Sequence, residues 1–490
     1  MAGIVSYGAY IPLYRINRAE FNRAWGGFAL PGETAVANYD EDSLTMAMEA
    51  ATDCLKGFDS KYVDGLFLAT TTCPYKERLG SSILAAALDL PSGIRTMDVT
   101  GTLRAGTTAM AAALDAINAG SARNVLVTVA DCRLGAPSGD FEQVLGSGAA
   151  ALLLGKESVI AEIRGSYFLS DEFSGVWRAD GDIFLRSWEG RMVLDKGYSS
   201  SLPEVMATLM QKYGLSPDDF AKVVYDAPTD VRRHAAVARN LKFDASQVQD
   251  PMYLTLGNTG AAMATMMLVA ALEEATPGDR MLFASYGNGA DAFLLETTTA
   301  VENLGGRRGI KRHMESKLML TNYETYLRWR GIIPLEAARR PEQSPTSISA
   351  LWRNRKEILA LYGVRCLNCG TPQYVNPSSS FTTGVTPVRL CVVCHAKDQF
   401  EPYRFADKKA TVFTFTQDNL AASPDPPATV TVVDFDEGGR AVFDMTDRDP
   451  AQLKVGMRVE MTFRKLFFDR GIHNYYWKTR PVRCQEEEDG

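Results

Sequence analysis

Four of the eight cysteines form two Cys-x-x-Cys pairs, Cys366 with Cys369 and Cys391 with Cys394. Two residues between ligands let both thiolates of a pair turn toward one ion, and four thiolates complete the tetrahedral coordination of Zn²⁺. Such a closed site has no open position for a reactive water. We therefore predict a structural zinc ion rather than a catalytic one, the alternative being four free cysteines in paired positions.

The segments after the cysteines predict a small β-barrel. Short runs of alternating apolar and polar residues, separated by Asp and Gly turns, are typical of barrel strands. These runs cover 411–416, 430–435, 441–445, 458–463 and 475–479.

Residues 3–298 alternate short apolar runs with amphipathic stretches, which predicts a layered α/β core. One pattern occurs twice: a small-residue helix at 105–114 precedes a strand at 123–130, and a similar helix at 259–268 precedes a strand at 280–285. Two similar halves indicate a duplication. We divide the chain into halves at 1–160 and 161–300, a basic linker and helical segment at 301–360, a zinc ribbon at 361–400 and a barrel at 401–490.

Composition argues against several classes of function. A net charge of -7 and a pI near 5.4 disfavour a nucleic-acid surface, which needs clustered Lys and Arg. The Gly-rich basic stretch at 305–313 is interpreted as a solvated linker, because blocks of like charge are usually exposed. No run of about 18 apolar residues predicts a membrane span, and the start lacks a signal-peptide pattern. We therefore expect a cytoplasmic protein.

Several runs carry a resemblance to a known family: 3–12, 130–142, 146–155, the Gly-Asn-Thr-Gly motif at 257–260 and the Ser-Tyr-Gly-Asn-Gly-Ala-Asp run at 285–291. On these residues the first 300 positions resemble hydroxymethylglutaryl-CoA synthase, within the thiolase superfamily. The resemblance implies a duplicated five-layer α/β/α/β/α fold, a substrate that is a thioester of coenzyme A, and a homodimer or a dimer of dimers.

The ribbon followed by a barrel resembles a second family, the acyl-CoA-associated proteins that pair a zinc ribbon with an OB fold. That resemblance implies an OB-type barrel. In many organisms such a module is a separate chain beside a thiolase-like enzyme, so a thiolase-like or acyl-CoA-pathway protein is a candidate partner. OB folds often bind nucleic acid, but the acidic balance of this chain argues against it.

The resemblance also implies where the synthase's catalytic residues should lie, and there this chain differs. The family uses a cysteine nucleophile at a helix start, a glutamate and a histidine. Short motifs place Leu103, Thr71 and Asp226 at these three positions. Leucine cannot form an acyl-enzyme. The retained features are Asn258, which in the family hydrogen-bonds near the thioester carbonyl, and the loop that starts at Ser285.

Other side chains are candidates to replace the lost catalytic residues. Asp226 is the first candidate, because a carboxylate in an apolar pocket has a raised pKa and can act as a general base. Tyr225 and Tyr286 are candidate proton donors, although each is also a plausible core or rim residue. Cys73 and Cys132 are alternative nucleophiles, the other interpretation being buried cysteines that only pack in the core. Two further expectations concern His234, expected at the surface, and Arg104, expected to pack or to bind an anion.

Three hypotheses follow. The first is an enzyme that cleaves or forms a carbon-carbon bond on a CoA thioester without a covalent intermediate, as an aldolase-type lyase does. The second is a synthase-like acyltransferase with a relocated nucleophile. The third is a non-catalytic CoA-binding or scaffold subunit of a thiolase-type complex. The segment 172–198, rich in Trp and Phe, is expected to form part of the pocket wall.

Overall fold

The computed structural model describes residues 1–336, 345–374 and 388–483. The chain folds into two compact units. The first unit comprises Met1–Ala37, Asp42–Leu84 and Leu90–Tyr326, and the second comprises Asn38–Glu41, Ala85–Asp89 and the described residues from Leu327 onward. The segment predicted as a linker, 301–360, is therefore shared between the units.

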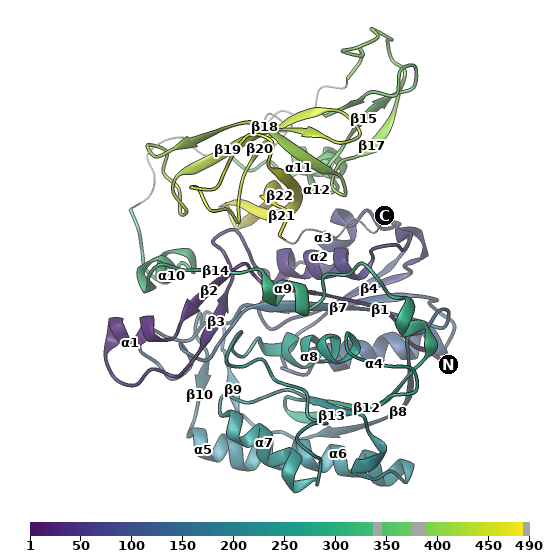
Figure 1. The fold of residues 1–490 in the computed structure, drawn as a ribbon, viewed down its shortest axis with the longest axis vertical. Helices are drawn as coiled ribbons and strands as arrows, with labels where there is room; N and C mark the ends of the chain where they lie inside the picture. The colour runs from purple at the N-terminus through teal and green to yellow at the C-terminus, as the bar shows by residue number, and fades with distance from the viewer. Residues whose placement is uncertain (337–344, 375–387, 484–490) are drawn as a thin grey trace. The chain divides into compact units, whose positions relative to one another are not determined.

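A nine-stranded mixed sheet forms the framework of the first unit (Figure 1). Its N-terminal part has the order β1-β7-β6-β4-β5, and its C-terminal part has the order β11-β12-β13-β8. The two parts meet only at β1 and β8, through the pairs Gly3 with Glu162 and Ile4 with Ala161. The strands span Gly3–Tyr10 (β1), Gly65–Ala69 (β4), Arg95–Val99 (β5), Val125–Asp131 (β6), Gly148–Gly155 (β7), Ala161–Ser170 (β8), Lys222–Tyr225 (β11), Arg280–Tyr286 (β12) and Gly289–Thr297 (β13).

Helices complete five layers, as the family resemblance implies (Figure 1). Helices α2 (Ser43–Cys54) and α3 (Gly80–Ala87) cover the outer face of the N-terminal part of the sheet. Helices α4 (Ala105–Asn118) and α8 (Met263–Leu272) lie between the two parts, and α6 (Ser199–Tyr213) and α7 (Val231–Asn240) cover the other outer face.

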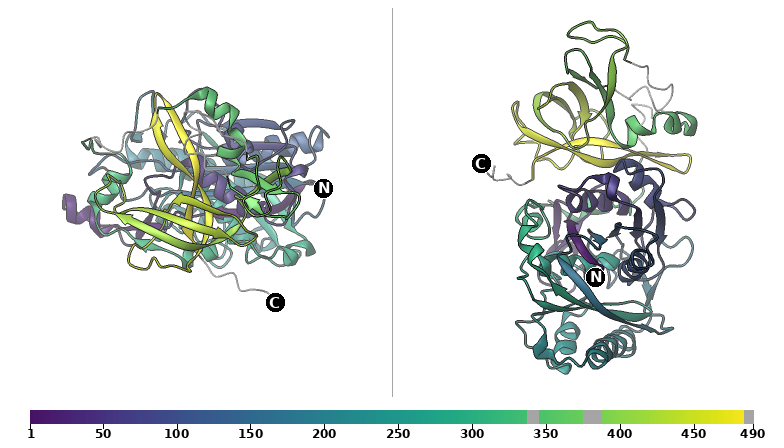
Figure 2. Two further views of the ribbon diagram at one scale, coloured as in Figure 1. Left: turned by 90° about the horizontal axis from the view of Figure 1, so that it is seen from above. Right: turned by 90° about the vertical axis from the view of Figure 1, so that its right-hand side faces the viewer.

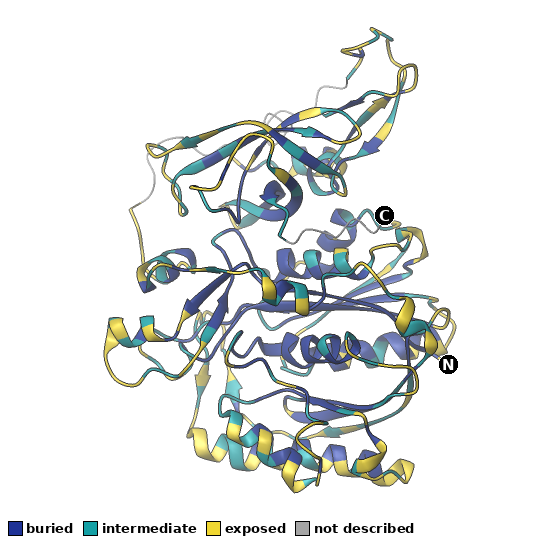
Figure 3. Cartoon of the chain, in the orientation of Figure 1, coloured by how far each residue is buried: buried dark blue, intermediate teal, exposed yellow. Residues whose placement is uncertain are grey.

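The two central helices confirm the predicted repeat. Each leads into a buried strand, α4 into β6 and α8 into β12. Every residue of α8 except Ala270 is buried, because this helix packs between two layers (Figure 3). A helix that is apolar all round is expected at such a position. Ala109, Met110 and Met267 belong to one apolar core shared by the two helices.

Smaller elements surround these layers. A three-stranded sheet has the order β14-β2-β3, and β9 pairs with β10. These elements and the remaining short helices span Tyr14–Asn17 (β2), Glu33–Val36 (β3), Val176–Trp177 (β9), Arg186–Ser187 (β10), Leu318–Met319 (β14), Ala19–Trp25 (α1), Gly190–Met192 (α5), Lys311–Glu315 (α9) and Tyr323–Trp329 (α10).

The second unit contains a five-stranded antiparallel barrel sheet of order β20-β19-β18-β21-β22. Strands β21 and β22 run side by side as a long hairpin, drawn in yellow in Figure 2. Along β19 and β20 each second residue is buried, as expected for strands with one face on a core. The barrel strands span Lys409–Asp418 (β18), Ala428–Phe435 (β19), Arg440–Asp444 (β20), Arg458–Asp469 (β21) and Ile472–Pro481 (β22).

All five predicted barrel segments are confirmed as strands. Before the barrel lie two short helices and a small three-stranded sheet of order β16-β15-β17. They span Ile348–Arg353 (α11), Arg355–Leu359 (α12), Tyr362–Cys366 (β15), Pro372–Gln373 (β16) and Phe400–Arg404 (β17).

The basic stretch at 305–313 is not the solvated linker that its composition suggests. The Arg307 guanidinium donates to Ser6 at 3.1 Å, and the backbone amides of Arg308 and Gly309 donate to the Asp53 carboxylate at 2.7 and 2.9 Å. His313 is buried. The stretch packs within the first unit, where the half-buried Asp53 carboxylate accepts its amides. In the described part of the chain, no helix combines the length and apolar character that a membrane crossing requires.

Candidate functional site

A cavity of about 270 Å³ lies in the first unit, beside the start of α4. Three segments form most of its lining: 101–103 before α4, 173–178 and the β12–β13 turn at 286–288. Thr71, Arg133 and Leu185 complete the lining. Residues 173–178 and Leu185 belong to the segment 172–198 expected in the pocket wall.

Leu103 lies in this lining next to the β12–β13 turn. Thr102 donates its hydroxyl hydrogen to the Gly287 carbonyl at 2.8 Å. A Cβ atom at Gly287 would stand 2.9 Å from the Leu103 amide nitrogen and 2.8 Å from that of Arg104, so a side chain has no room there. The close approach of these two backbones holds Leu103 and Tyr286 at one cavity.

Thr71 is held by a carboxylate that sequence reasoning missed. Asp131, at the end of β6, is fully buried. It accepts hydrogen bonds from the amide and hydroxyl of Thr71 at 2.7 and 2.8 Å, from the hydroxyls of Thr70 and Thr72, and from the amide of Ala261. Because five donors surround it, Asp131 fixes the backbone of 70–72 against the start of the α8 region.

Asp226 directly follows β11 and is 8% exposed. Its Oδ1 accepts the Tyr286 amide at 3.0 Å, and its carbonyl accepts the Tyr198 hydroxyl at 2.8 Å. No other residue in the described chain donates to the carboxylate. Burial raises the pKa of Asp226 from 3.8 to about 7, against the opposing effects of the Tyr286 amide and of the positive charge on Arg133. A carboxyl group with this pKa can take up or release a proton near neutrality.

Arg133 brings a positive charge to the cavity. It is 6% exposed, and its Nη2 donates to Asn258 Oδ1 at 2.5 Å. Asn258 Oδ1 also accepts the Gly260 amide at 3.0 Å, while Asn258 Nδ2 donates to the Ala227 carbonyl at 2.9 Å. Both ends of the Asn258 carboxamide are thus hydrogen-bonded, and its contact with the cavity wall is through Arg133, which belongs to the lining.

Comparison with known proteins shows which family this chain belongs to. The chain is 31% identical over 347 residues to a hydroxymethylglutaryl-CoA synthase of Pyrobaculum calidifontis and 33% identical over 349 residues to that of Caldivirga maquilingensis. Each alignment covers 68% of this chain and 98% of the relative. The chain belongs to the hydroxymethylglutaryl-CoA synthase family.

Solved structures share the fold of the first unit, and a family model matches part of the second. The structure of HMG-CoA synthase complexed with CoA has a TM-score of 0.62 at 18% identity and covers 71% of this chain and 94% of its own. A 3-oxoacyl-[acyl-carrier-protein] synthase III from Aquifex aeolicus has a TM-score of 0.53 at 22% identity and covers 60% and 100%. Residues 403–464 match the model of the ChsH2 C-terminal OB-fold domain.

Several predicted site residues of this synthase-family chain are buried, or are bonded to other residues of the chain. The buried Tyr225 donates its hydroxyl hydrogen to the His234 carbonyl at 2.7 Å and stacks on the His234 ring. His234 is 4% exposed, so the expected surface position is wrong, and burial lowers its pKa to about 4. Arg104 pairs with the buried Asp291 at 2.5 Å. Ser285 is buried within β12.

The two alternative nucleophiles are not in the cavity lining. Cys132 is 9% exposed and follows β6, and burial raises the pKa of the Cys73 thiol. A raised pKa lowers the fraction of thiolate, which is the reactive form. Cys73 therefore lacks the environment of an activated nucleophile, and Cys132 is buried outside the cavity lining.

The four paired cysteines converge, as their spacing predicts. Their sulfur atoms all lie within 4.8 Å of one another, with 3.6 Å between Cys366 and Cys394 and 3.5 Å between Cys369 and Cys391. Tetrahedral Zn²⁺ with bonds of about 2.3 Å requires sulfur separations of about 3.8 Å, so the cluster fits. Each pair is followed by a left-handed residue, Gly370 or His395, whose amide donates to the first cysteine's carbonyl.

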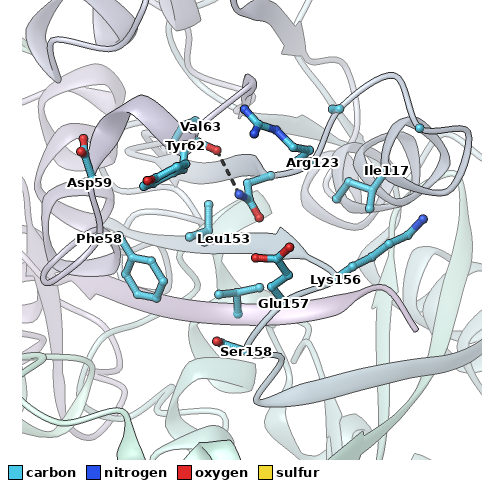
Figure 4. Close-up of a pocket in the computed structure, with 14 residues that line it drawn as sticks. Phe58, Asp59, Tyr62, Val63, Ile117, Arg123, Leu153, Lys156, Glu157 and Ser158 are labelled. Atoms are coloured by element: carbon cyan, nitrogen blue, oxygen red, sulfur yellow. Dashed lines mark hydrogen bonds between the residues drawn. The ribbon is translucent and has the colours of Figure 1, made fainter.

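A second hollow of about 440 Å³ lies at the other end of α4 (Figure 4). Ile117 from the last turn of α4 and Arg123, Lys156 and Glu157 contribute to its lining. Helix α4 has 14 residues and is therefore about 21 Å long. The hollow is separated from the Leu103 cavity by that length and contains none of the predicted site residues.

Proposed function

We propose that this chain catalyses cleavage or formation of a carbon-carbon bond on a CoA thioester without an acyl-enzyme intermediate. Two observations carry the proposal. Leu103 lies in the cavity lining, at the position expected for the family's cysteine, and the buried Asp226 accepts the amide of the lining residue Tyr286 and has its pKa raised to about 7. Acyl transfer needs a nucleophile, whereas an aldol or retro-aldol step needs only a base and a group that stabilises an enolate.

In the retro-aldol direction Asp226 accepts the proton of a β-hydroxyl group. The bond between the α and β carbons then breaks, the β carbon becomes a carbonyl, and the electron pair is held as the thioester enolate. The enolate takes back one proton at the α carbon, so no oxidant or reductant is required. Positive charge and hydrogen-bond donors near the thioester oxygen stabilise the enolate, and Arg133 and Tyr286 are our candidates for this role.

Tyr286 suits a donor role. Burial raises its pKa to about 12, so the hydroxyl stays protonated at neutral pH. Its ring packs edge-on against Tyr198, with 5.6 Å between centroids, and it lies in the cavity lining. No described residue hydrogen-bonds to its hydroxyl. Tyr225 lacks this freedom, because its hydroxyl is committed to the His234 carbonyl.

The test is turnover of a panel of β-hydroxyacyl-CoA thioesters, followed by mass spectrometry of the released acyl-CoA and carbonyl product. We expect Asp226→Asn to lower kcat by about 10²-fold or more, with Cys73→Ala and Cys132→Ala near the wild-type rate. A covalent acyl adduct on either cysteine, detected by intact-mass measurement, would instead support the acyltransferase with a relocated nucleophile.

The scaffold alternative rests on the predicted replacement of all three catalytic positions of the family by Leu103, Thr71 and Asp226. It predicts binding of CoA without turnover, and co-purification with an active thiolase-like enzyme. Turnover by the purified chain alone would exclude it.

We also propose that Cys366, Cys369, Cys391 and Cys394 hold one structural Zn²⁺. The donor set and sulfur separations support this assignment, since four thiolates saturate the ion and leave no site for substrate. Metal analysis of the purified protein tests it, and less than about 0.2 zinc per chain after purification without chelators would count against it.

Association as a homodimer is a further part of the proposal. In the described sheet β5 lies at one edge, where unpaired backbone groups can be met by a second copy. Light scattering after size-exclusion chromatography measures the mass directly. The free thiols Cys54, Cys73 and Cys132 are consistent with a reducing, cytoplasmic location, which we also propose.

A further inference from the structure

A π-helical turn, Val193–Tyr198, joins α5 to α6. Such a turn takes in one more residue than a turn of α-helix, so it changes which side chains face the neighbouring layer, and π-helical turns are frequent at functional sites. The last two residues of this one, Gly197 and Tyr198, are both buried. They contact Tyr286 and Asp226, the two groups to which the proposed reaction gives the donor and the base.

Gly197 lies against the Tyr286 phenol. A Cβ atom at residue 197 would overlap the Tyr286 hydroxyl oxygen and stand 2.9 Å from two ring atoms of Phe173. Phe173 and Tyr286 both belong to the cavity lining. A methyl group at residue 197 would therefore displace the phenol by about 1 Å or more, since atoms that are not bonded to each other settle about 3.5 Å apart.

Tyr198 contacts both groups. Its hydroxyl donates to the Asp226 carbonyl at 2.8 Å, and its ring packs edge-on against that of Tyr286. The side chain is 2% exposed and lies on the buried stripe of α6 with Leu202 and Val205, in one apolar core. Burial raises the pKa of Tyr198, and the negative charge on Asp226 adds to this effect. The hydroxyl therefore stays protonated at neutral pH, and the packing of α6 fixes where it donates.

The Tyr286 amide closes the arrangement by donating to the Asp226 carboxylate at 3.0 Å. We propose that Gly197 and Tyr198 are positioning residues. Gly197 sets where the Tyr286 hydroxyl stands, and Tyr198 sets where the Asp226 carboxyl group stands. Displacing a reacting group by about 1 Å costs about 10²-fold in rate. This inference rests on the proposed function, because that function assigns the base and the donor to the two positioned groups.

The test is a double-mutant cycle on kcat, measured with 3-hydroxybutanoyl-CoA and the full-length chain. Gly197→Ala should lower kcat by at least about 10-fold and change KM by less than about 2-fold, because it displaces a reacting group without removing a binding contact. In the Tyr286→Phe background, which lacks the displaced oxygen, Gly197→Ala should lower kcat by less than about 2-fold. A residue needed only for folding would lower kcat by the same factor in both backgrounds.

The matched control is Gly190→Ala in α5, which should leave kcat unchanged, because outside the helix itself nothing in the described chain lies within 4 Å of the added Cβ atom. Tyr198→Phe keeps the ring and removes the hydroxyl, and it keeps the proposal testable if Gly197→Ala fails to fold. It should lower kcat by at least about 10-fold in the wild type and by less than about 2-fold in Asp226→Asn.

Equal losses in both backgrounds of either cycle would overturn the positioning roles and leave the proposed function intact. Absence of turnover by the wild type would overturn the proposed function for this thioester, and the positioning roles with it.

Discussion

Replacing Asp226 by asparagine should change how stability depends on pH, whatever the substrate. The carboxyl pKa is about 7 in the folded chain against an ordinary value of 3.8, because the charged form is desolvated. Between about pH 4 and pH 7 the unfolded chain releases this proton while the folded chain keeps it. The free energy of unfolding therefore falls as the pH rises through this window.

The expected change in the free energy of unfolding follows from the size of the Asp226 pKa shift. A rise of about 3 pH units at 1.36 kcal/mol per unit corresponds to about 4 kcal/mol, which is fully expressed only above the folded-state pKa. Asp226→Asn has nearly the same shape, keeps an oxygen for the Tyr286 amide and cannot ionise. Relative to the wild type, the variant should gain up to about 4 kcal/mol of stability between pH 4.5 and pH 8.5.

The assay is denaturant unfolding of both proteins at several pH values. Because the chain has two units, two transitions are expected, and the pH-dependent difference should appear in only one of them. Asp230→Asn is the matched control. Hydrogen bonds from the Arg232 side chain lower the Asp230 pKa, so the stability that the Asp230 carboxylate contributes is fully present above pH 4. The free energy of unfolding of Asp230→Asn should therefore be lower than that of the wild type by a constant amount from pH 5 to pH 8.5. An equally constant difference for Asp226→Asn would refute the raised pKa and the base assigned to it.

Three further changes test other parts of the fold. If the four cysteines hold one zinc ion as proposed, Cys391→Ser should lower the zinc content from about one per chain to near zero and reduce the melting temperature of the second unit, since a structural zinc site contributes directly to folding; retention of zinc would contradict the four-cysteine site. Arg104→Ala should cost about 3–5 kcal/mol in denaturant unfolding, because it leaves the Asp291 charge buried and unpaired; a loss below 1 kcal/mol would contradict this. Leu103→Cys should become acylated by an acyl-CoA, seen by intact-mass measurement, because a helix N-terminus lowers a thiol pKa; an adduct no greater than on Leu79→Cys would remove Leu103 from the expected nucleophile position.

The parts of the fold that sequence predicted are those set by local patterns. Alternating burial in β19 and β20 repeats a period of two that is visible in the residues, and the small-residue helices α4 and α8 recur before apolar strands. The spacing within the two cysteine pairs was enough to predict that the four sulfur atoms lie together. In each case neighbours in the chain are also neighbours in space, so periodicity and spacing suffice.

The parts that sequence did not predict depend on contacts between distant segments. Arg133 and Asn258 are 125 positions apart, and Arg178 and the Thr71 carbonyl are 107 apart. An arginine two residues after a buried strand is the one local signal that points to Arg133. His234 was misplaced for the same reason: on a helix with many charged neighbours nothing local indicates that its ring stacks on Tyr225.

The energetic state of the cavity bears on the choice between an enzyme and a scaffold. A buried donor without an acceptor costs about 1–3 kcal/mol, and a desolvated carboxyl group adds a further penalty once it ionises. Arg133 and Asp226 both carry such penalties beside one cavity. The described chain does not offset either penalty fully, because Arg133 Nε has no acceptor and the Asp226 carboxylate accepts only the Tyr286 amide from other residues. A chain that moves a proton on a bound substrate makes use of the raised pKa of Asp226. The unsatisfied Nε of Arg133 and the desolvated carboxyl group of Asp226 therefore favour the proposed catalytic role over a structural one.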